Sequence, residues 1–226
     1  MNDTNNDIPG LPDKLQIATV VSAPFEENTY IVWSKCDRRA VVIDPGLQPG
    51  EILAVLDDLQ LELQAIWLTH GHADHIGGNA TLKRRYPDCP ILIHPLDEPK
   101  LTDPWQNLSA QFGLELRSPP ADRLINEDDV LEVGGMKWRV AHLPGHCAGH
   151  VVFISEGLEL TVVLAGDTLF NGSVGRTDFP DGDPPALLRG IREKLYTLPD
   201  STIILPGHGE MTTVGEEKES NPYVRA

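Results

Sequence analysis

The densest group of potential metal ligands lies in the stretch WLTHGHADHIGG, residues 67–78. Three of the chain's eight histidines and one aspartate fall within six positions, as His70, His72, Asp74 and His75. Imidazole nitrogens and carboxylate oxygens suit zinc, and also iron or manganese. Because residues two apart can point the same way in a tight turn, we expect His70 and His72 to bind one ion. Asp74 and His75 could then face a second.

Three later segments repeat this arrangement, each at the end of an apolar run. They are HLPGHCAGH, VVLAGDTLF and IILPGHG, and the candidates they add are His142, His146, His150, Asp167 and His208. Neighbouring glycines let the backbone approach closely. The sequence therefore predicts that four loops at the margin of a sheet converge on one site.

Short runs rich in Val and Ile predict the strands that carry these loops. The runs cover residues 15–21, 28–33, 39–44, 64–69, 89–94, 136–143, 150–155, 160–166 and 202–206. Helical spacing of apolar residues predicts helices over residues 49–61, 75–86 and 183–198. Asp183 is the expected N-cap of the last helix, with Pro184 at its first position. Hairpins come first and helices and strands then intermix, which indicates a mixed α+β class.

The length of 226 residues suits one large domain. We expect residues 1–14 to be a flexible lead-in and residues 15–226 to form the domain. Residues 96–122, rich in Pro and polar side chains, are expected to be a long surface excursion of the kind that often carries function. Within it, Trp105 and Phe112 could line an acyl pocket or anchor the loop to the core.

Charge and cysteine usage narrow the function classes. Lys and Arg number 18 against 34 Asp and Glu, a net charge of −16, which argues against a nucleic-acid partner. No apolar run of about 18 residues is present, so no membrane association is expected. Three widely spaced cysteines without a CxxC predict free thiols, and with no apparent signal peptide they indicate a cytoplasmic protein.

The unbroken pattern His-x-His-x-Asp-His, with the later His, Asp and His, resembles the metallo-β-lactamase superfamily. The resemblance covers residues 15 to 222. It implies an αββα sandwich, two β-sheets with helices on both outer faces. It further implies two divalent metal ions, zinc first, with iron or manganese also accepted. The residues carried over are His70, His72 and His146 for one metal, Asp74, His75 and His208 for the other, and Asp167 as the bridge.

GDTLF followed by GSVGR, and PGHG near the C-terminus, are similar to the small glyoxalase II-like (hydroxyacylglutathione hydrolase-like) members. That resemblance implies hydrolysis of a small thioester such as S-lactoylglutathione by a metal-bridging hydroxide. Asp74 and Asp167 would set the ligand charge and position the attacking oxygen. Arg176 would bind a substrate carboxylate. The chain is expected to act as a monomer or a homodimer.

The match departs from full-length glyoxalase II in two respects. The C-terminal helical extension that supplies much of the glutathione site is not expected here. Asp178 and Glu210 stand where that family has tyrosines near the glutathione. Both departures leave the glutathione requirement open.

Two other functions stay open at this point. The stretch GRTDF is also found in persulfide dioxygenases, which have the same fold and use one iron. A member that has lost its metals would be a binding protein instead of an enzyme.

Two residues beside the ligand set have more than one interpretation. His150 either orients a ligand from behind or is a satisfied core histidine. Cys147 is either a redox-sensitive thiol near the metals or a small buried packing residue.

Overall fold

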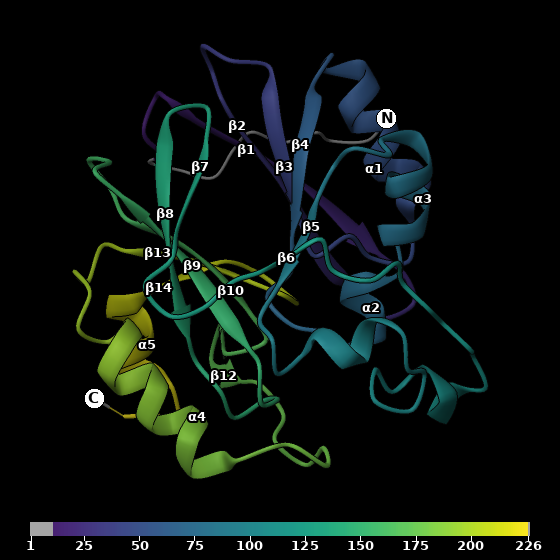
Figure 1. The fold of residues 1–226 in the computed structure, drawn as a ribbon. Coiled ribbons are helices and arrows are strands. Elements are labelled where there is room, and N and C mark those ends of the chain that lie inside the picture. The colour runs from purple at the N-terminus through teal and green to yellow at the C-terminus, as the bar shows by residue number, and fades with distance from the viewer. Residues whose placement is uncertain (1–10, 226) are drawn as a thin grey trace.

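Two six-stranded sheets face each other and carry helices on their outer sides in the computed structural model, which describes residues 11–225 (Figure 1). The first sheet has the order β1-β2-β3-β4-β5-β6, formed by Leu15–Ser22, Glu27–Ser34, Arg39–Ile43, Glu62–Trp67, Ile91–Ile93 and Arg123–Leu124. The second has the order β14-β13-β10-β9-β8-β7, formed by Thr212–Thr213, Ile203–Pro206, Val162–Gly166, Val151–Glu156, Met136–His142 and Val130–Val133. A small hairpin joins β11 (Leu169–Phe170) to β12 (Ser173–Val174).

Five α-helices and three helical turns of other types lie within the described part of the chain. The α-helices are α1 (Pro49–Asp58), α2 (Ala73–Ile76), α3 (Asn79–Arg85), α4 (Pro184–Gly190) and α5 (Val214–Ser220). The turns are η1 (Glu98–Leu101), η2 (Ser109–Phe112) and the π-helical η3 (Ile191–Leu195).

Three separate apolar clusters hold the layers together. The central one lies between the sheets, where Trp67 of β4, Trp138 of β8 and Phe153 of β9 meet. A second packs α1 and α3 on the first sheet, and a third packs α4 and η3 on the second. Each sheet therefore buries both faces, and this confirms the expected αββα sandwich.

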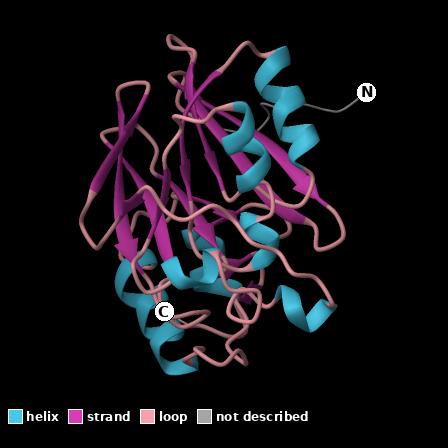
Figure 2. Ribbon diagram, turned by 45° about the vertical axis from the view of Figure 1, so that its right-hand side comes forward, coloured by secondary structure: helices cyan, strands magenta, loops and turns pink. Residues whose placement is uncertain are grey.

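Parallel pairing places several strand ends at one edge of the molecule. β3, β4 and β5 run parallel to one another, and β10 runs parallel to β13. Figure 2 shows that the loops gather at the lower end of both sheets. Parallel strands end on the same side, so the loops that follow them lie close together.

The sequence predictions of regular structure are largely confirmed. All nine expected strands are present, and Asp183 caps α4 by accepting a hydrogen bond from the Ala186 N–H, with Pro184 at the first position. The short strands β6, β7, β11, β12 and β14 and the helix α5 were not anticipated.

The single helix expected over residues 75–86 is wrong, because the chain breaks there into α2 and α3. The loop after β3 presses against the break. The Gly78 N–H donates to the Pro45 carbonyl at 2.7 Å, and a Cβ at position 78 would lie 2.9 Å from the Pro45 Cβ. The two glycines, Gly77 and Gly78, weaken the helix at this point, and the contact with Pro45 takes the Gly78 N–H out of the helical hydrogen-bond pattern.

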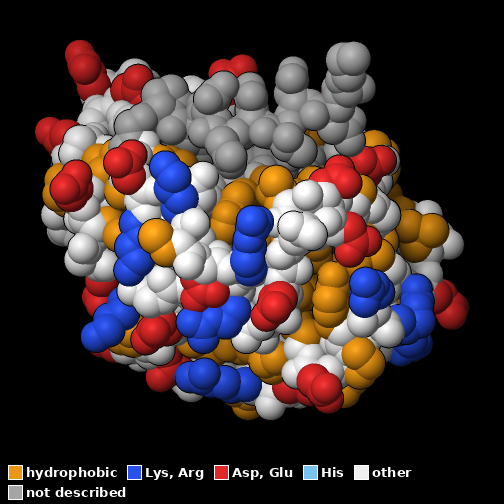
Figure 3. All heavy atoms as spheres, turned by 90° about the horizontal axis from the view of Figure 1, so that it is seen from above, with side chains coloured by type: hydrophobic (Ala, Val, Ile, Leu, Met, Phe, Trp, Pro, Cys, Tyr) orange, Lys and Arg blue, Asp and Glu red, His pale blue; other side chains and the backbone are white. Residues whose placement is uncertain are grey.

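The exterior is polar and mixed in charge. Figure 3 shows acidic, basic and apolar side chains interspersed on one face, with no histidine visible among its described atoms. None of the described helices is long and apolar enough to cross a membrane. The three cysteines form no disulfide and are free thiols. The flexible lead-in expected at residues 1–14 falls mostly on residues 1–10, which lie outside the described residues.

Replacing Phe153 by Ala should lower the free energy of unfolding by about 3–5 kcal/mol, because it opens a cavity between the sheets. Phe153 is fully buried, with its ring 5.4 Å from that of Trp67. Urea denaturation measures the change. Val130→Ala is the control, since that side chain is 49% exposed, and it should cost less than about 0.5 kcal/mol. Equal losses in the two variants would contradict the central packing role of Phe153.

Candidate metal centre

Four loops that follow β4, β8, β10 and β13 bring the seven predicted ligands to one edge of the sandwich. The loop after β4 carries His70 and His72, and α2 follows it with Asp74 and His75. The β8–β9 loop carries His146. The remaining two ligands, Asp167 and His208, come directly after β10 and shortly after β13.

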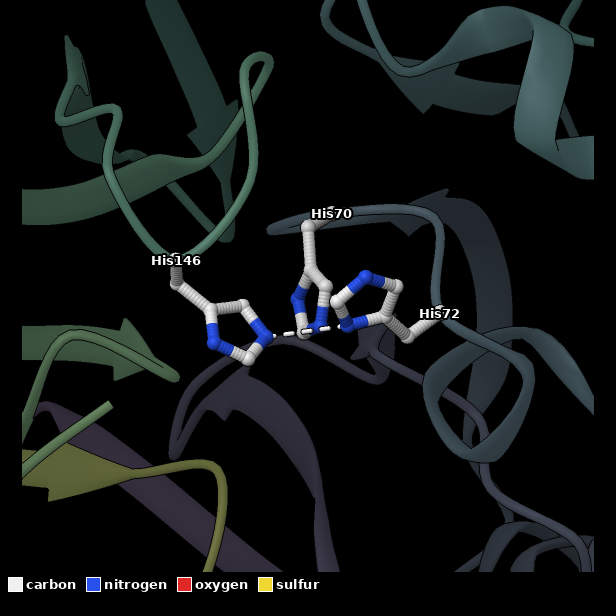
Figure 4. A group of neighbouring side chains, drawn as sticks. All are labelled: His70, His72 and His146. Carbon is white, nitrogen blue, oxygen red and sulfur yellow. Dashed lines mark hydrogen bonds between the residues drawn. The ribbon is translucent and has the colours of Figure 1, made fainter. Parts of the chain in front are cut away.

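The first group consists of three histidines whose ring nitrogens lie within 4.8 Å of one another: His70, His72 and His146. Their rings point toward a common centre (Figure 4). The His146 Nε2 and the His72 Nδ1 are 2.9 Å apart. The second group consists of Asp74, His75 and His208, and one donor atom from each lies within 4.8 Å of the other two.

Asp167 lies between the two groups. Its Oδ2 is 3.5 Å from the His146 Nε2 of the first group and 3.6 Å from the His208 Nε2 of the second. Its Oδ1 is 3.5 Å from the His75 Nε2. One carboxylate therefore faces ligands of both groups.

Contacts from outside the centre fix the orientation of the histidine rings. In four of them the Nδ1 atom is engaged by a neighbouring oxygen, which leaves Nε2 as the free ligand atom. The pairs are His70 with the Thr69 Oγ1 (3.0 Å), His75 with the Asp44 Oδ2 (3.1 Å), His146 with the Arg176 carbonyl (2.8 Å) and His208 with the Phe25 carbonyl (3.0 Å).

The two groups differ in their electrostatics. Burial, reinforced by the neighbouring histidines, holds the pKa values of His70 and His72 well below the ordinary range. Burial also lowers the pKa of His146, although Asp167 opposes the shift. These imidazoles are neutral near pH 7, and neutral imidazole is the form that binds metals.

The second group contains one carboxylate, Asp74, and the carboxylates of Asp167 and Asp44 also face its His75 ring. Burial acts against the charged form of Asp74, but the His75 and His208 side chains outweigh it and hold the Asp74 pKa at about 2. Burial also opposes protonation of His75, yet Asp167, Asp74 and Asp44 raise its pKa well above the usual range. This side of the centre attracts positive charge.

The donor set fits bound cations. Among the described residues, the buried atoms His70 Nε2, His75 Nε2 and Asp167 Oδ1 have no hydrogen-bond partner, and His72 turns its Nδ1 toward the His146 Nε2 of the same group. An unpaired buried polar atom costs about 1–3 kcal/mol. Several such atoms at one centre are accounted for if they ligate metal.

A family model described as the metallo-beta-lactamase superfamily matches residues 23–208. The chain belongs to this superfamily. Hydroxyacylglutathione hydrolase GloC of Haemophilus influenzae is 36% identical over 214 residues, which cover 94% of this chain and 99% of the relative.

Solved structures of the superfamily show the same fold. The BLEG-1 B3 metallo-beta-lactamase has a TM-score of 0.88 at 34% identity, covering 93% of this chain and all of that one. TTHA1623 in a di-iron-bound form has a TM-score of 0.79 at 39% identity, over 91% and 99% of the chains. ETHE1 from Myxococcus xanthus has a TM-score of 0.73 at 26% identity, over 91% and 83%.

The other histidines lie outside the two groups. The His150 Nε2 accepts a hydrogen bond from the Asp167 N–H at 2.9 Å, and its ring stacks on that of His70. His142 and His94 stack on each other, with ring centroids 4.2 Å apart. His150 thus contacts the backbone of one predicted ligand and the ring of another.

The sequence analysis missed Asp44. Its buried carboxylate accepts hydrogen bonds from the Thr69 N–H (2.7 Å) and hydroxyl (2.5 Å) besides contacting His75. The signal was present, since VVIDPG places Asp44 directly after an apolar strand, as VVLAGD places Asp167.

The sequence analysis also missed Asp97, which ties the two histidine loops together. Its Oδ2 accepts a hydrogen bond from the Gly71 N–H at 2.8 Å, and its Oδ1 accepts one from the Gly149 N–H at 2.8 Å. The buried Lys100 ammonium donates to Oδ1 at 2.9 Å. No local pattern in LDEPK marks this residue, because its partners lie 26 and 52 residues away.

Close packing explains the glycines at these contacts. A Cβ at position 149 would lie 2.6 Å from the Asp97 Oδ1, and one at position 71 would lie 2.6 Å from the Lys100 Cβ. Donor atoms of Asp97, Cys147 and Asp181 also lie within 4.8 Å of one another. Lys100 already supplies the cation there, since it lies 2.9 Å from Asp97 and 2.7 Å from Asp181.

Cys147 is a buried packing residue. Its side chain is inaccessible to solvent, and its thiol donates to the Asp97 Oδ2 at 3.1 Å. Burial raises the pKa of the Cys147 thiol well above its ordinary value, which disfavours the reactive thiolate.

A cavity of about 430 Å³ adjoins the two groups. Arg176 and Phe112 line it, whereas Trp105 is 73% exposed and outside the lining, so its suggested place in the pocket is wrong. The Arg176 guanidinium forms a two-point ion pair with Asp178, with Nε to Oδ1 at 3.0 Å and Nη2 to Oδ2 at 2.8 Å.

Asp97→Asn should lower the free energy of unfolding of the metal-free protein by about 3 kcal/mol or more. The amide can accept on one side only, so one glycine N–H loses its acceptor and Lys100 loses a buried anionic partner. Urea denaturation measures the loss.

Asp57→Asn is the matched control, because the Asp57 carboxylate is 61% exposed and pairs with Arg85 on the surface at 3.7 Å. It should change stability by less than about 0.5 kcal/mol. An Asp97→Asn protein as stable as this control would show that the two histidine loops do not depend on Asp97.

Proposed function

We propose that the chain is a metal-dependent hydrolase that cleaves a small thioester, with S-lactoylglutathione as the first substrate to assay. Two divalent metal ions would be held, zinc first, with iron or manganese as alternatives. The ligands would be His70, His72 and His146 for one ion, Asp74, His75 and His208 for the other, and Asp167 for both.

The observation that carries this proposal is the position of the Asp167 carboxylate, 3.5–3.6 Å from ring nitrogens of both groups. The 36% identity to hydroxyacylglutathione hydrolase GloC, over nearly the full length of both chains, supports the thioester substrate. Di-iron-bound TTHA1623, at 39% identity, supports a centre of two metals and also supports iron as an alternative to zinc.

Two divalent cations at such a centre lower the pKa of a coordinated water and act as Lewis acids toward a carbonyl. The protein's part is to keep the donors oriented and the reacting water in place. The His75 Nε2 is 3.9 Å from the Asp74 Oδ2 and 3.5 Å from the Asp167 Oδ1, so both carboxylates face one small space. There they can accept hydrogen bonds from the attacking water and orient it toward the thioester carbon. Arg176 lines the same cavity and could meet a substrate carboxylate after leaving Asp178.

A persulfide dioxygenase with one iron is the second candidate. ETHE1 from Myxococcus xanthus supports it, at 26% identity over 91% of this chain. Because BLEG-1 is described as a B3 metallo-beta-lactamase, a β-lactam belongs in the same panel of substrates.

Metal analysis combined with three assays on one preparation separates these candidates. Thiol release from S-lactoylglutathione at two metals per chain is the expected result. Oxygen uptake with glutathione persulfide at one iron per chain would replace the hydrolase with the dioxygenase. Hydrolysis of the β-lactam alone would replace the thioester substrate.

Asp167→Ala should reduce the metal content from two ions to one or fewer and reduce thioester hydrolysis by more than about 100-fold. Loss of an outer contact to a ligand already costs about 10–100-fold, and Asp167 would contact both ions directly. Metal analysis and thiol release measure the two effects. Asp58→Ala, on the exposed side of α1, should retain both metals and full activity. A variant at 167 that kept both would refute the bridging assignment.

A further inference from the structure

One side of the cavity beside the candidate metal centre is apolar. Phe25 lies between β1 and β2, and its ring meets that of Phe112 edge-on, with centroids 5.3 Å apart. We call this side of the cavity the apolar wall, formed by Phe25, Leu47, Leu108, Phe112, Leu114 and Leu116.

Part of the apolar wall is exposed to solvent. Phe112 is 62% exposed and Leu114 is 48% exposed. Exposed apolar side chains that border a cavity of about 430 Å³ are the feature expected of a site that binds an apolar group.

The excursion that carries most of the apolar wall is fixed relative to the metal centre. The buried Asn107 Nδ2 donates to the carbonyls of Lys100 and Leu116 at 3.0 Å each, which closes the loop. The Asn107 backbone carbonyl accepts a hydrogen bond from the Ala73 N–H at 2.9 Å, at the start of the helix that carries Asp74 and His75. Leu108 follows in the left-handed region at φ 71°, a strained conformation that the anchored loop imposes.

The cavity offers little to a strongly anionic group. Arg176 is the one lysine or arginine among the described residues that line it, and Asp178 already pairs with its guanidinium. A glutathione moiety carries two carboxylates, and at most one of them could meet Arg176. The lining is therefore better matched to an apolar substituent than to a charged peptide.

We propose that the apolar wall binds an alkyl or aryl substituent of the substrate, so that the preferred thioester is more apolar than S-lactoylglutathione. This specificity rests on the proposed thioesterase function. It makes Phe112 a specificity-determining residue, while hydrolysis itself depends on the metal centre.

Two series of thioesters test the proposal on the metal-loaded protein. One extends a straight acyl chain from acetyl to octanoyl on N-acetylcysteamine, and the other extends the thiol from ethanethiol to octanethiol with an acetyl group. In one of the two series kcat/KM should rise by up to about fourfold per methylene until the cavity is filled. The responsive series identifies whether the acyl or the thiol side contacts the apolar wall.

Phe112→Ala should remove at least half of that chain-length dependence, measured as the slope of kcat/KM with chain length within the variant. Trp105→Ala is the matched control, because it removes an exposed aromatic ring from the same excursion but outside the cavity lining. It should leave the whole series unchanged.

Non-hydrolysable amides of the same chain lengths separate this proposal from the function on which it rests. If no thioester is hydrolysed but the amides bind more tightly with length and Phe112→Ala weakens them, the thioesterase function fails and the apolar wall is supported. Hydrolysis that is independent of chain length in both series would refute binding of an apolar substituent by the apolar wall, and it would still support the proposed thioesterase function. An unchanged dependence in Phe112→Ala would also overturn it.

Discussion

The structure depends on holding the seven candidate ligand side chains with their donor atoms turned toward one another. Buried imidazole nitrogens and carboxylate oxygens at 3–4 Å gain nothing from each other unless a cation or a proton lies between them. The protein offsets part of the unfavourable free energy of burying these atoms by giving the two groups different charge. The three histidines of the first group are kept neutral, and on the other side Asp74 and Asp167 face His75 and His208, whose pKa values are raised. Metal ions would supply the remaining compensation.

The loops that carry these side chains must be held rigidly, and contacts from both sheets hold them. Asp44 holds the loop after β4 through Thr69 and His75, and it belongs to the end of the neighbouring strand β3. Asp97 joins that loop to the β8–β9 loop of the second sheet. The sandwich core fixes the sheets, and two buried carboxylates then fix the loops to each other, so the ligand geometry follows from packing far from the ligands.

The segment between β5 and β6 borders the cavity beside this centre. Asn107 ties the excursion to α2, which carries two of the candidate ligands, so the apolar wall and the metal centre share one anchor. Under the proposed specificity, a change in that loop would alter substrate preference without altering the candidate ligand set. Superfamily membership is consistent with this division, because its relatives here include a hydroxyacylglutathione hydrolase and a B3 metallo-beta-lactamase on one fold.

The sequence by itself determined the nine longer apolar strands, the fold class and the seven residues that meet at the sheet margin, because apolar periodicity and a histidine or aspartate after a strand are local features. It did not determine the break between α2 and α3, to which Pro45 contributes from another loop. It gave no sign of Asp97, and it left open whether Trp105 and Phe112 line the cavity or anchor their loop to the core. Those features depend on contacts between segments 26 to 52 residues apart or on the path of an irregular loop, and such contacts exist only once the two sheets have packed.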